Sequence, residues 1–258
     1  MLQATEAGRR IPLVATTTQP STLTARQKAL KSTVIAKFVM AGSGILMALF
    51  LLVHMYGNLK VFAGKTADGQ WAFDVYAHHL RVMGEPILPP EGLLWITRVV
   101  LLVAVIAHFA SAFKLWARAK KAVGGKRYAS GGRVQRSYAS YTMRWGGVVI
   151  LLFIIAHILQ FTTHTIDTWG GDAAASTPFE RLVLSFQNPL VLIAYVIAII
   201  AVGLHLTHGL WSAFATLGAN TGAKARANLN KLAVLIALVI VVGFLAGPFA
   251  IFFGGITL

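Results

Sequence analysis

The chain of 258 residues contains no cysteine. This absence excludes disulfides, thiolate nucleophiles, cysteine-ligated iron–sulfur clusters and covalently attached c-type haem. Charge is also scarce, because only 12% of the residues are charged and 8 acidic residues stand against 23 Lys and Arg. Together with 57% hydrophobic residues and a mean hydropathy of +0.70, this composition excludes an ordinary soluble domain and predicts an integral membrane protein.

The net charge of +15 does not indicate nucleic-acid binding. The basic residues alternate with long apolar segments and form neither a basic helical face nor a known motif. We interpret them as topology signals and as a docking surface. Residues 1–32 lack a compact apolar core followed by a small-residue cleavage site. We therefore interpret them as a retained cytoplasmic tail and place the membrane domain at residues 33–258.

Five apolar segments are long enough to cross a bilayer, which takes roughly 20 residues as a helix. Alternation with a period of two is absent, and most segments are too long for barrel strands. The sequence therefore predicts an all-α membrane protein with five transmembrane helices. We expect the connection at 57–92 to fold over the outer mouth of the bundle as short helical and irregular pieces. The predicted spans are 33–56, 93–116, 141–165, 189–217 and 231–253.

The connections rich in Lys and Arg are predicted to be cytoplasmic. The connection between the second and third spans carries seven basic residues and no acid, and the one between the fourth and fifth carries Lys224 and Arg226. Both termini follow from this assignment, with the N-terminus in the cytoplasm and the C-terminus outside. Seven acidic residues fall in the two outer connections, in agreement with this orientation, namely Asp68, Asp74, Glu85, Glu91, Asp167, Asp172 and Glu180.

Each of the first four predicted helices carries a histidine among apolar residues. An ionisable side chain inside a span is a functional-site hypothesis by default. Counting depth at about 1.5 Å per residue places His54 and His157 at an outer level. The same count places His108 and His205 at an inner level. Within each pair the two helices run in the same direction.

Two stacked haem b sites explain this arrangement, because a six-coordinate b-type haem needs one neutral imidazole on each face. Four of the five helices would then form a haem-binding bundle. Zinc would gather three or four ligands at one depth, and no carboxylate or thiolate lies at these depths. A proton relay is the alternative. Nearby glycines can admit a macrocycle or can serve as helix contacts, namely Gly42, Gly44, Gly146, Gly147, Gly203 and Gly209.

Two further residues are candidates for contacts around a haem. His208 follows His205 by three residues and occupies a neighbouring position on the helix. We interpret it either as a structural hydrogen-bonding residue or as a contact to a haem propionate. Arg144, with other basic residues of the cytoplasmic rim, can pair with a propionate or with an acidic partner surface. Its alternative role is topology retention.

Four segments resemble the cytochrome b membrane anchor of succinate dehydrogenase and fumarate reductase in its single-chain, five-helix, two-haem form. They are LLVHMYGNLKVF, LLVAVIAHFASAF, RWGGVVILLFIIAHILQF and GLHLTHGLWSAFATLG. The resemblance covers residues 37–258, and its most specific piece is the last of these segments. It implies that His54 and His157 ligate the distal, outer haem iron. It implies equally that His108 and His205 ligate the proximal, inner haem iron.

The resemblance also implies partners. A flavoprotein subunit and an iron–sulfur subunit would dock on the cytoplasmic face of a bacterial-type inner membrane, and menaquinone or another quinone would react in the bundle. The chain would then carry electrons between the iron–sulfur subunit and the quinone through two haem b groups, in either direction. The alternatives are a haem-free structural or proton-conducting anchor and the cytochrome b anchor of another membrane dehydrogenase.

A quinone site needs an apolar slot and a hydrogen-bonding or titratable group. Acidic, basic and aromatic residues gather just before and within the start of the second span. There we predict Glu85 and Arg98 as catalytic residues, and Glu85 resembles the outer-end glutamate of some relatives. His79, Arg81 and Trp95 are predicted to bind the quinone. The alternative is a lid of interfacial residues without a quinone.

Overall fold

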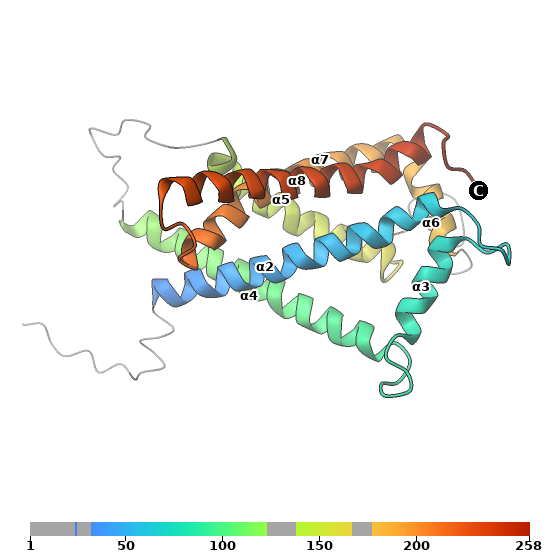
Figure 1. The fold of residues 1–258 in the computed structure, drawn as a ribbon, viewed down its shortest axis with the longest axis horizontal. Helices are drawn as coiled ribbons and strands as arrows, with labels where there is room; N and C mark the ends of the chain where they lie inside the picture. The colour runs from blue at the N-terminus through green and yellow to red at the C-terminus, as the bar shows by residue number, and fades with distance from the viewer. Residues whose placement is uncertain (1–23, 25–31, 123–137, 167–176) are drawn as a thin grey trace, which may run out of the picture. The chain divides into compact units, whose positions relative to one another are not determined.

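The computed structural model describes residue 24 and residues 32–122, 138–166 and 177–258 (Figure 1). Five helices in this part are long and apolar enough to cross a membrane, as predicted. No strand is formed among the described residues, so the prediction of an all-α, multi-pass membrane protein is confirmed. The five helices are α2 (Thr33–Asn58), α4 (Gly92–Ala122), α5 (Tyr138–Phe161), α7 (Pro189–Thr216) and α8 (Ala223–Phe252).

Three short helices join these spans at one end of the bundle (Figure 1). The 3-10 helix η1 (Leu59–Ala63) and α3 (Ala72–Val82) occupy the connection at 57–92, which confirms short helical pieces there. Helix α6 (Pro178–Phe186) was not predicted. It begins with a capping box, in which the Thr177 hydroxyl accepts from the Glu180 amide and the Glu180 carboxylate accepts from the Thr177 amide.

Three predicted helix ends are wrong. Helix α5 ends at Phe161, not at 165, because the chain turns there and His164 adopts a positive φ of 54°. Helix α4 continues to Ala122 instead of ending at 116, and α8 begins at Ala223 instead of 231. Both extensions contain Lys and Arg, whose long side chains allow a helix to continue from hydrocarbon into the polar interface.

The helices pack in a fixed order. Helix α2 packs against α4 and α7, α5 packs against α7, and α8 packs against α7 and α2. Within the described residues, α4 packs closely with neither α5 nor α7, and α2 does not pack closely with α5. Any contact between α2 and α5, or between α4 and α7, must therefore be made by side chains that reach across the bundle.

The buried core lies mainly on α6, α7 and α8. One cluster joins Phe179, Val183 and Phe186 of α6 to the first half of α7, with Val61 and Ile251 beside it. A second cluster joins α2, α7 and α8. Its buried members are Ala48, Leu206, Leu210, Ala233, Ala237 and Ile240. Helices α4 and α5 contribute few buried residues and expose large apolar side chains such as Leu102, Ile106, Trp145 and Leu152, as expected of helices that face lipid.

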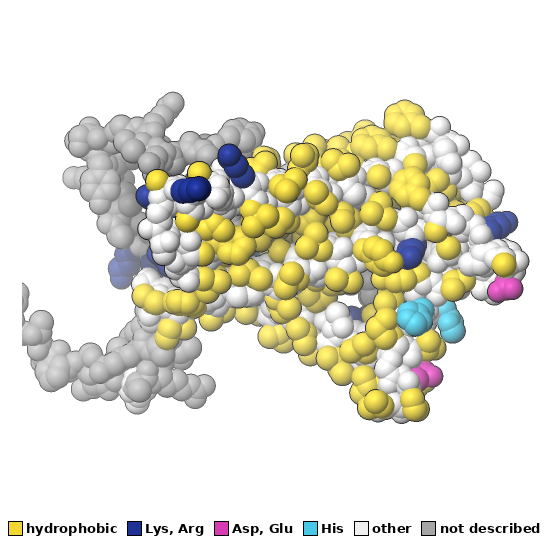
Figure 2. Space-filling view, in the orientation of Figure 1, with side chains coloured by type: hydrophobic (Ala, Val, Ile, Leu, Met, Phe, Trp, Pro, Cys, Tyr) yellow, Lys and Arg dark blue, Asp and Glu magenta, His cyan; other side chains and the backbone are white. Residues whose placement is uncertain are grey.

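The two ends of the bundle differ in charge (Figure 2). The end where α2, α5 and α8 begin, here called the basic end, carries no acid among the described residues. The part of this end that the structure describes holds nine basic residues, which are Lys37, Lys114, Arg118, Lys120, Lys121, Arg144, Lys224, Arg226 and Lys231. The opposite, mixed-charge end carries five basic residues and all five described acids, which are Asp68, Asp74, Glu85, Glu91 and Glu180. Asp167 and Asp172 of the outer connection lie outside the described residues, as do residues 123–137 of the predicted basic connection.

Candidate functional site: two histidine pairs

The four histidines in the spans meet as two pairs. The imidazole centres of His54 and His157 are 5.9 Å apart with an interplanar angle of 82°. Those of His108 and His205 are 6.1 Å apart at 61°. Each pair joins two helices that do not pack closely with each other, α2 with α5 and α4 with α7. These are the pairs that the depth count predicts.

Two levels of the bundle lie ten residues apart on three helices. Gly44 lies beside His108 and Gly147 beside His205, whereas Tyr195 lies beside His157. Ten helical residues span about 15 Å. The two levels are therefore about 15 Å apart along the bundle. The inner and outer residues are Gly44 and His54 on α2, Gly147 and His157 on α5, and His205 and Tyr195 on α7.

Helix α2 fixes the orientation of the His108 ring at the inner level. The Nδ1 atom of His108 lies 3.1 Å from the carbonyl oxygen of Met40 and 3.4 Å from Oγ of Ser43. A carbonyl oxygen only accepts, and the Ser43 hydroxyl already donates to the carbonyl of Val39 at 2.6 Å. Nδ1 therefore carries the proton, and Nε2 keeps its lone pair.

The other inner histidine leaves a polar atom unpaired. Among the described residues, Nδ1 of His205 is buried and has no hydrogen-bond partner. Such an atom costs about 1–3 kcal/mol, and folded proteins contain few of them. A Cβ added to Gly44 would lie 3.2 Å from Cε1 of His108, and one added to Gly147 would lie 3.8 Å from Cε1 of His205. Side chains larger than hydrogen would therefore narrow the space around this pair.

Aromatic residues surround the outer level. His54 stacks on Phe50 with ring centres 5.2 Å apart, and His157 lies between Phe153 and Phe161. Nδ1 of His157 lies 3.1 Å from the Tyr195 hydroxyl. That hydroxyl donates its single hydrogen to Oε1 of Gln160 at 2.8 Å, so its oxygen accepts from His157. His157, like His108, thus carries its proton on Nδ1 and has a free lone pair on Nε2.

The separation of each pair fits one metal ion between two imidazoles. Bonds of about 2.0–2.1 Å from a metal to each ring nitrogen place the ring centres roughly 6 Å apart. In the described residues no three of His, Asp and Glu converge as ligands, so a tetrahedral zinc site does not fit. Gly44 and Gly147 lie beside the rings of His108 and His205, and their lack of side chains would favour a flat macrocycle at this pair. His54 with His157, and His108 with His205, would therefore be able to hold the iron of a haem at each level.

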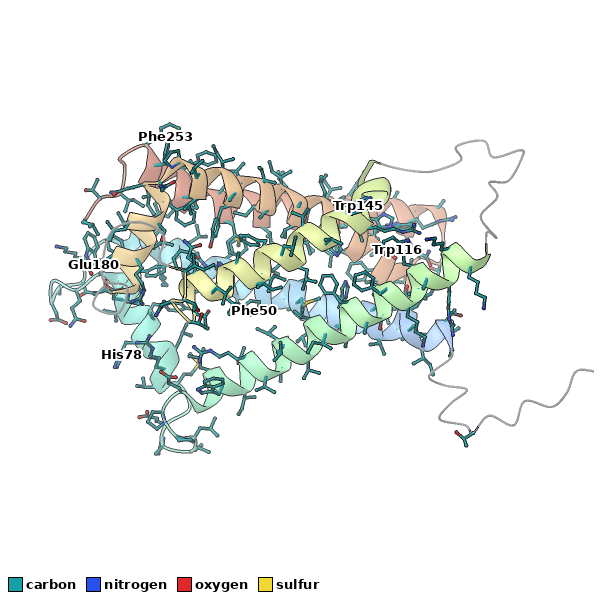
Figure 3. The ribbon with its side chains drawn as sticks, turned by 180° about the vertical axis from the view of Figure 1, so that it is seen from behind. Phe50, His78, Trp116, Trp145, Glu180 and Phe253 are labelled. Carbon is teal, nitrogen blue, oxygen red and sulfur yellow. The ribbon has the colours of Figure 1, made fainter. Side chains whose placement is uncertain are left out.

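The two residues predicted to contact an inner haem, His208 and Arg144, lie near the basic end. The His208 ring is partly buried and lies 6.2 Å from the ring of Trp211 on the same helix. The guanidinium of Arg144 lies 5.5 Å from the ring centre of Trp116, so it connects α5 with α4. Figure 3 labels Trp116 on α4 and Trp145, the residue after Arg144, on α5. A shallow cleft of 330 Å³ adjoins this contact, lined by Phe113, Trp116, Ala117 and Lys120. A propionate contact for His208 and Arg144 stays a prediction.

The other glycines named from the sequence differ in what lies beside them. A Cβ at Gly203 would lie 2.5 Å from Val241 of α8, so this glycine permits a close helix contact. Gly42 and Gly146 have open space in the direction of a side chain. Gly209 lies beside His205 of its own helix, with 4.0 Å between its added Cβ and Cδ2 of that ring.

The residues predicted for the quinone site are only partly brought together. The guanidinium of Arg98 lies 4.8 Å from the ring centre of Trp95. Arg81 pairs with Glu91, with 3.6 Å between Nε and Oε1, rather than with Glu85. His79 and Glu85 are exposed. Their roles in quinone chemistry stay predictions.

Charged groups also surround His164 at the mixed-charge end, outside the spans. Partial burial, and then the guanidinium of Arg181, lower the pKa of His164 below its ordinary 6.5. Arg81 acts in the same direction, while the carbonyl of Phe161 opposes it. Burial and the charge of Arg81 likewise lower the pKa of Arg181. Protonation of His164 is therefore less favourable in the folded chain than that of an ordinary exposed histidine.

Tyr195 and Gln160 are the site residues that sequence reasoning missed. Gln160 follows His157 by three residues and so lies on the same part of the helix surface, which was a readable signal. Tyr195 is the one polar-tipped side chain in the run LVLIAYVIAII, and its contact depends on how α7 is rotated against α5. Comparison with known proteins finds no match for this chain among protein-family models, curated proteins or solved structures.

Proposed function

We propose that this chain is the membrane-anchor cytochrome b subunit of a succinate:quinone oxidoreductase or fumarate reductase. The observation that carries the haem part is the pair of imidazole separations, 5.9 and 6.1 Å, each across helices that do not pack on one another. The succinate or fumarate part is supported by the resemblance of the four histidine-bearing segments to that family. In this proposal His54 and His157 hold the outer haem b, and His108 and His205 hold the inner one.

The chain's own residues would bind and orient the haems. The Met40 carbonyl and the Tyr195 hydroxyl hold protons on Nδ1 of His108 and His157, so Nε2 of each ring would be the atom available to a haem iron. Bound b-type haem supplies reversible one-electron transfer at a potential set by its surroundings. Apolar helices around both levels exclude water, and the ten-residue spacing sets the two sites about 15 Å apart along the bundle.

The charge asymmetry supports an orientation for this proposal. Nine basic residues and no described acid mark the basic end as the cytoplasmic one under the positive-inside rule. The N-terminus then lies in the cytoplasm and the C-terminus outside, in a bacterial-type inner membrane. The flavoprotein and iron–sulfur subunits would dock at the basic end, nearest the inner haem, and membrane lipid would contact the exposed apolar faces of α4 and α5.

The quinone, menaquinone or a related one, would react at the mixed-charge end. Trp95 and Arg98 offer an aromatic face with a cation beside it, close to the start of α4. Arg81, His79 and Glu85 lie on the preceding helix and turn, where Glu85 could exchange protons with solvent because it is exposed. This placement puts the quinone nearer the outer haem than the inner one.

Purification of the complex through a tag on this chain tests the proposal. We expect two b haems per chain by pyridine haemochrome analysis, and succinate should reduce them when flavoprotein and iron–sulfur subunits co-purify. His78→Ala is a matched control, because it removes an exposed histidine outside both pairs and should retain both haems. A preparation with no b haem, or with one haem per chain, would overturn the assignment. Two haems with other co-purifying subunits would indicate the anchor of a different dehydrogenase.

A haem-free, proton-conducting anchor is the second candidate. It is favoured by the hydrogen-bonded series His157, Tyr195 and Gln160, which resembles the start of a proton relay. This candidate predicts a colourless chain. In reconstituted vesicles it also predicts a proton flux that Tyr195→Phe abolishes.

A further inference from the structure

We infer that Tyr195, supported by Gln160, is a positioning residue that sets the proton and ring orientation of His157 and thereby tunes the outer haem alone. The inference rests on the proposed function. It begins from an ordered chain of hydrogen bonds, in which His157 donates to the Tyr195 oxygen at 3.1 Å and Tyr195 donates to Gln160 at 2.8 Å. Each step has one direction only, because the amide oxygen accepts and the hydroxyl has a single hydrogen.

The fold holds the Tyr195 ring in place. It is 9% exposed and meets three phenylalanines edge to face, at 4.9 Å from Phe153 and Phe186 and 6.2 Å from Phe161. Such perpendicular contacts are favourable for aromatic pairs. Contacts from α5 and α6 therefore fix the position of the Tyr195 ring independently of its hydrogen bond to His157. Because the hydroxyl is held in this way, its hydrogen bond sets the orientation of the His157 imidazole.

Helix α7 begins where this placement requires. The Asn188 side chain accepts a hydrogen bond from the Leu190 amide at 2.8 Å, and Pro189 occupies the first turn, where its lack of an N–H costs nothing. The start of α7 therefore fixes Tyr195 two turns inside the helix, at the outer level. His205 follows ten residues later at the inner level.

The hydrogen bond to Tyr195 affects the electronic character of His157. Donation to Gln160 polarises the phenol oxygen and makes it a better acceptor. Stronger donation from Nδ1–H raises the basicity of Nε2, as second-shell acceptors do for metal-bound histidines. A more basic ligand favours the oxidised iron, so the Tyr195 hydroxyl should lower the reduction potential of the outer haem.

The inner level provides an internal reference. There the acceptor for His108 is the backbone carbonyl of Met40, which no side-chain substitution removes. Tyr195 touches the outer pair, and ten residues of α7 separate it from His205. Loss of its hydroxyl should therefore change one haem and leave the other unchanged.

Tyr195→Phe in the purified complex is the test, since it keeps the packed ring and removes only the hydroxyl. Optical redox titration should show two haems, with the outer potential shifted upward and the inner one unchanged. The low-spin ferric EPR signal of the outer haem should change as its ligand ring is released. Transfer of the outer haem to apomyoglobin should show an affinity of this site for haem that is about 10- to 100-fold weaker, the usual range when a hydrogen-bond partner of a metal ligand is lost.

Gln160→Leu is the second variant, and it keeps the tyrosine. It should shift the outer potential in the same direction by a smaller amount, because the hydroxyl remains as a weaker acceptor. This variant decides the matter if Tyr195→Phe does not assemble. Unchanged potentials, or equal shifts of both haems, would overturn the inference while leaving two b haems in place. A wild-type complex without b haem would instead overturn the proposed function.

Discussion

The inner and outer levels hold their histidine pairs at nearly the same separation, 6.1 and 5.9 Å, by different means. At the inner level the neighbours are Gly44, Gly147 and a backbone carbonyl, and one imidazole nitrogen is left unpaired. At the outer level the neighbours are packed aromatic rings and a tyrosine hydroxyl. The inner pair thus depends on small neighbouring residues and the outer pair on packed side chains. We therefore expect the inner pair to be sensitive to larger side chains and the outer pair to truncated ones.

The difference follows the distribution of the core. Helix α6 brings Phe179, Val183 and Phe186 against the outer half of α7, so side chains are densely packed around the outer pair. Helix α4 packs closely with neither α5 nor α7 among the described residues, and Gly44 and Gly147 lie beside the inner pair. Removing atoms should therefore harm the outer level, whereas adding atoms should harm the inner level.

The largest expected effect is loss of one haem from one level. His205→Ala should remove the inner haem and His157→Ala the outer one, so each variant should retain one b haem of the two expected. The reason is that a b-type haem of this kind needs both axial imidazoles. Pyridine haemochrome analysis gives the stoichiometry, and redox titration identifies which haem remains. Loss of both haems in either variant, or of neither, would contradict independent pairs.

Phe179→Ala should produce the next largest effect, on the stability of the outer level. Phe179 is 0% exposed and stacks on Trp71 with ring centres 3.9 Å apart, while its amide donates to the Asp74 carboxylate at 2.8 Å. Truncating a buried phenylalanine costs about 3–5 kcal/mol. Thermal unfolding in detergent checks this value. Phe113→Ala is the matched control near the basic end, where the ring is 46% exposed, and it should cost much less.

The sequence predicted the five spans because hydropathy and length are properties of each segment alone. It also predicted which histidines meet, because the direction of each helix and the position of one residue in it suffice for that. The depth count assigned the histidines to two levels but did not give the distance between the levels. The spacing became visible only when Gly44 and Gly147 were seen beside the opposite histidines.

Contacts between helices were beyond the sequence. Whether Tyr195 faces His157 or lipid depends on the rotation of α7, which the core cluster with α6 and α8 determines. Helix α6 itself was within reach, since Thr177-Pro-Phe-Glu180 is a readable capping box with proline in the first turn. The ion pair between Arg81 and Glu91 could not be predicted from the sequence, because it depends on a backbone turn in which Glu91 adopts a positive φ of 61°.

Gly44→Ala should have a moderate effect that is confined to the inner level. The added methyl group would lie 3.2 Å from the His108 ring, so the ring must shift or the helices must separate. Overpacking of this kind costs about 1–3 kcal/mol, which corresponds to roughly 5- to 150-fold weaker retention of the inner haem. Transfer to apomyoglobin measures it. Gly42→Ala, two residues away with open space around it, should leave both haems unchanged. Equal effects of the two substitutions would refute a specific role for Gly44.

The smallest expected effect is a pH dependence at the mixed-charge end. Because the pKa of His164 is lower in the folded chain than its ordinary 6.5, the unfolded chain binds more protons just below that pH. Stability should therefore be fully present above pH 6.5 and fall as the pH is lowered through it. His164→Asn tests this, since asparagine tolerates the positive φ of 54° and does not titrate there.

The thermal midpoint of the wild-type chain should fall more between pH 8 and pH 5 than that of His164→Asn. The difference should be small beside that of Phe179→Ala, because His164 is only partly buried and solvent screens its charge. If the thermal midpoint of the wild-type chain fell less than that of His164→Asn between pH 8 and pH 5, the predicted direction of the pKa shift of His164 would be wrong. In that case the acids near Arg181, which are Asp74 and Glu180, would outweigh the two arginines at His164. The mixed-charge end would then hold the imidazolium instead of excluding it.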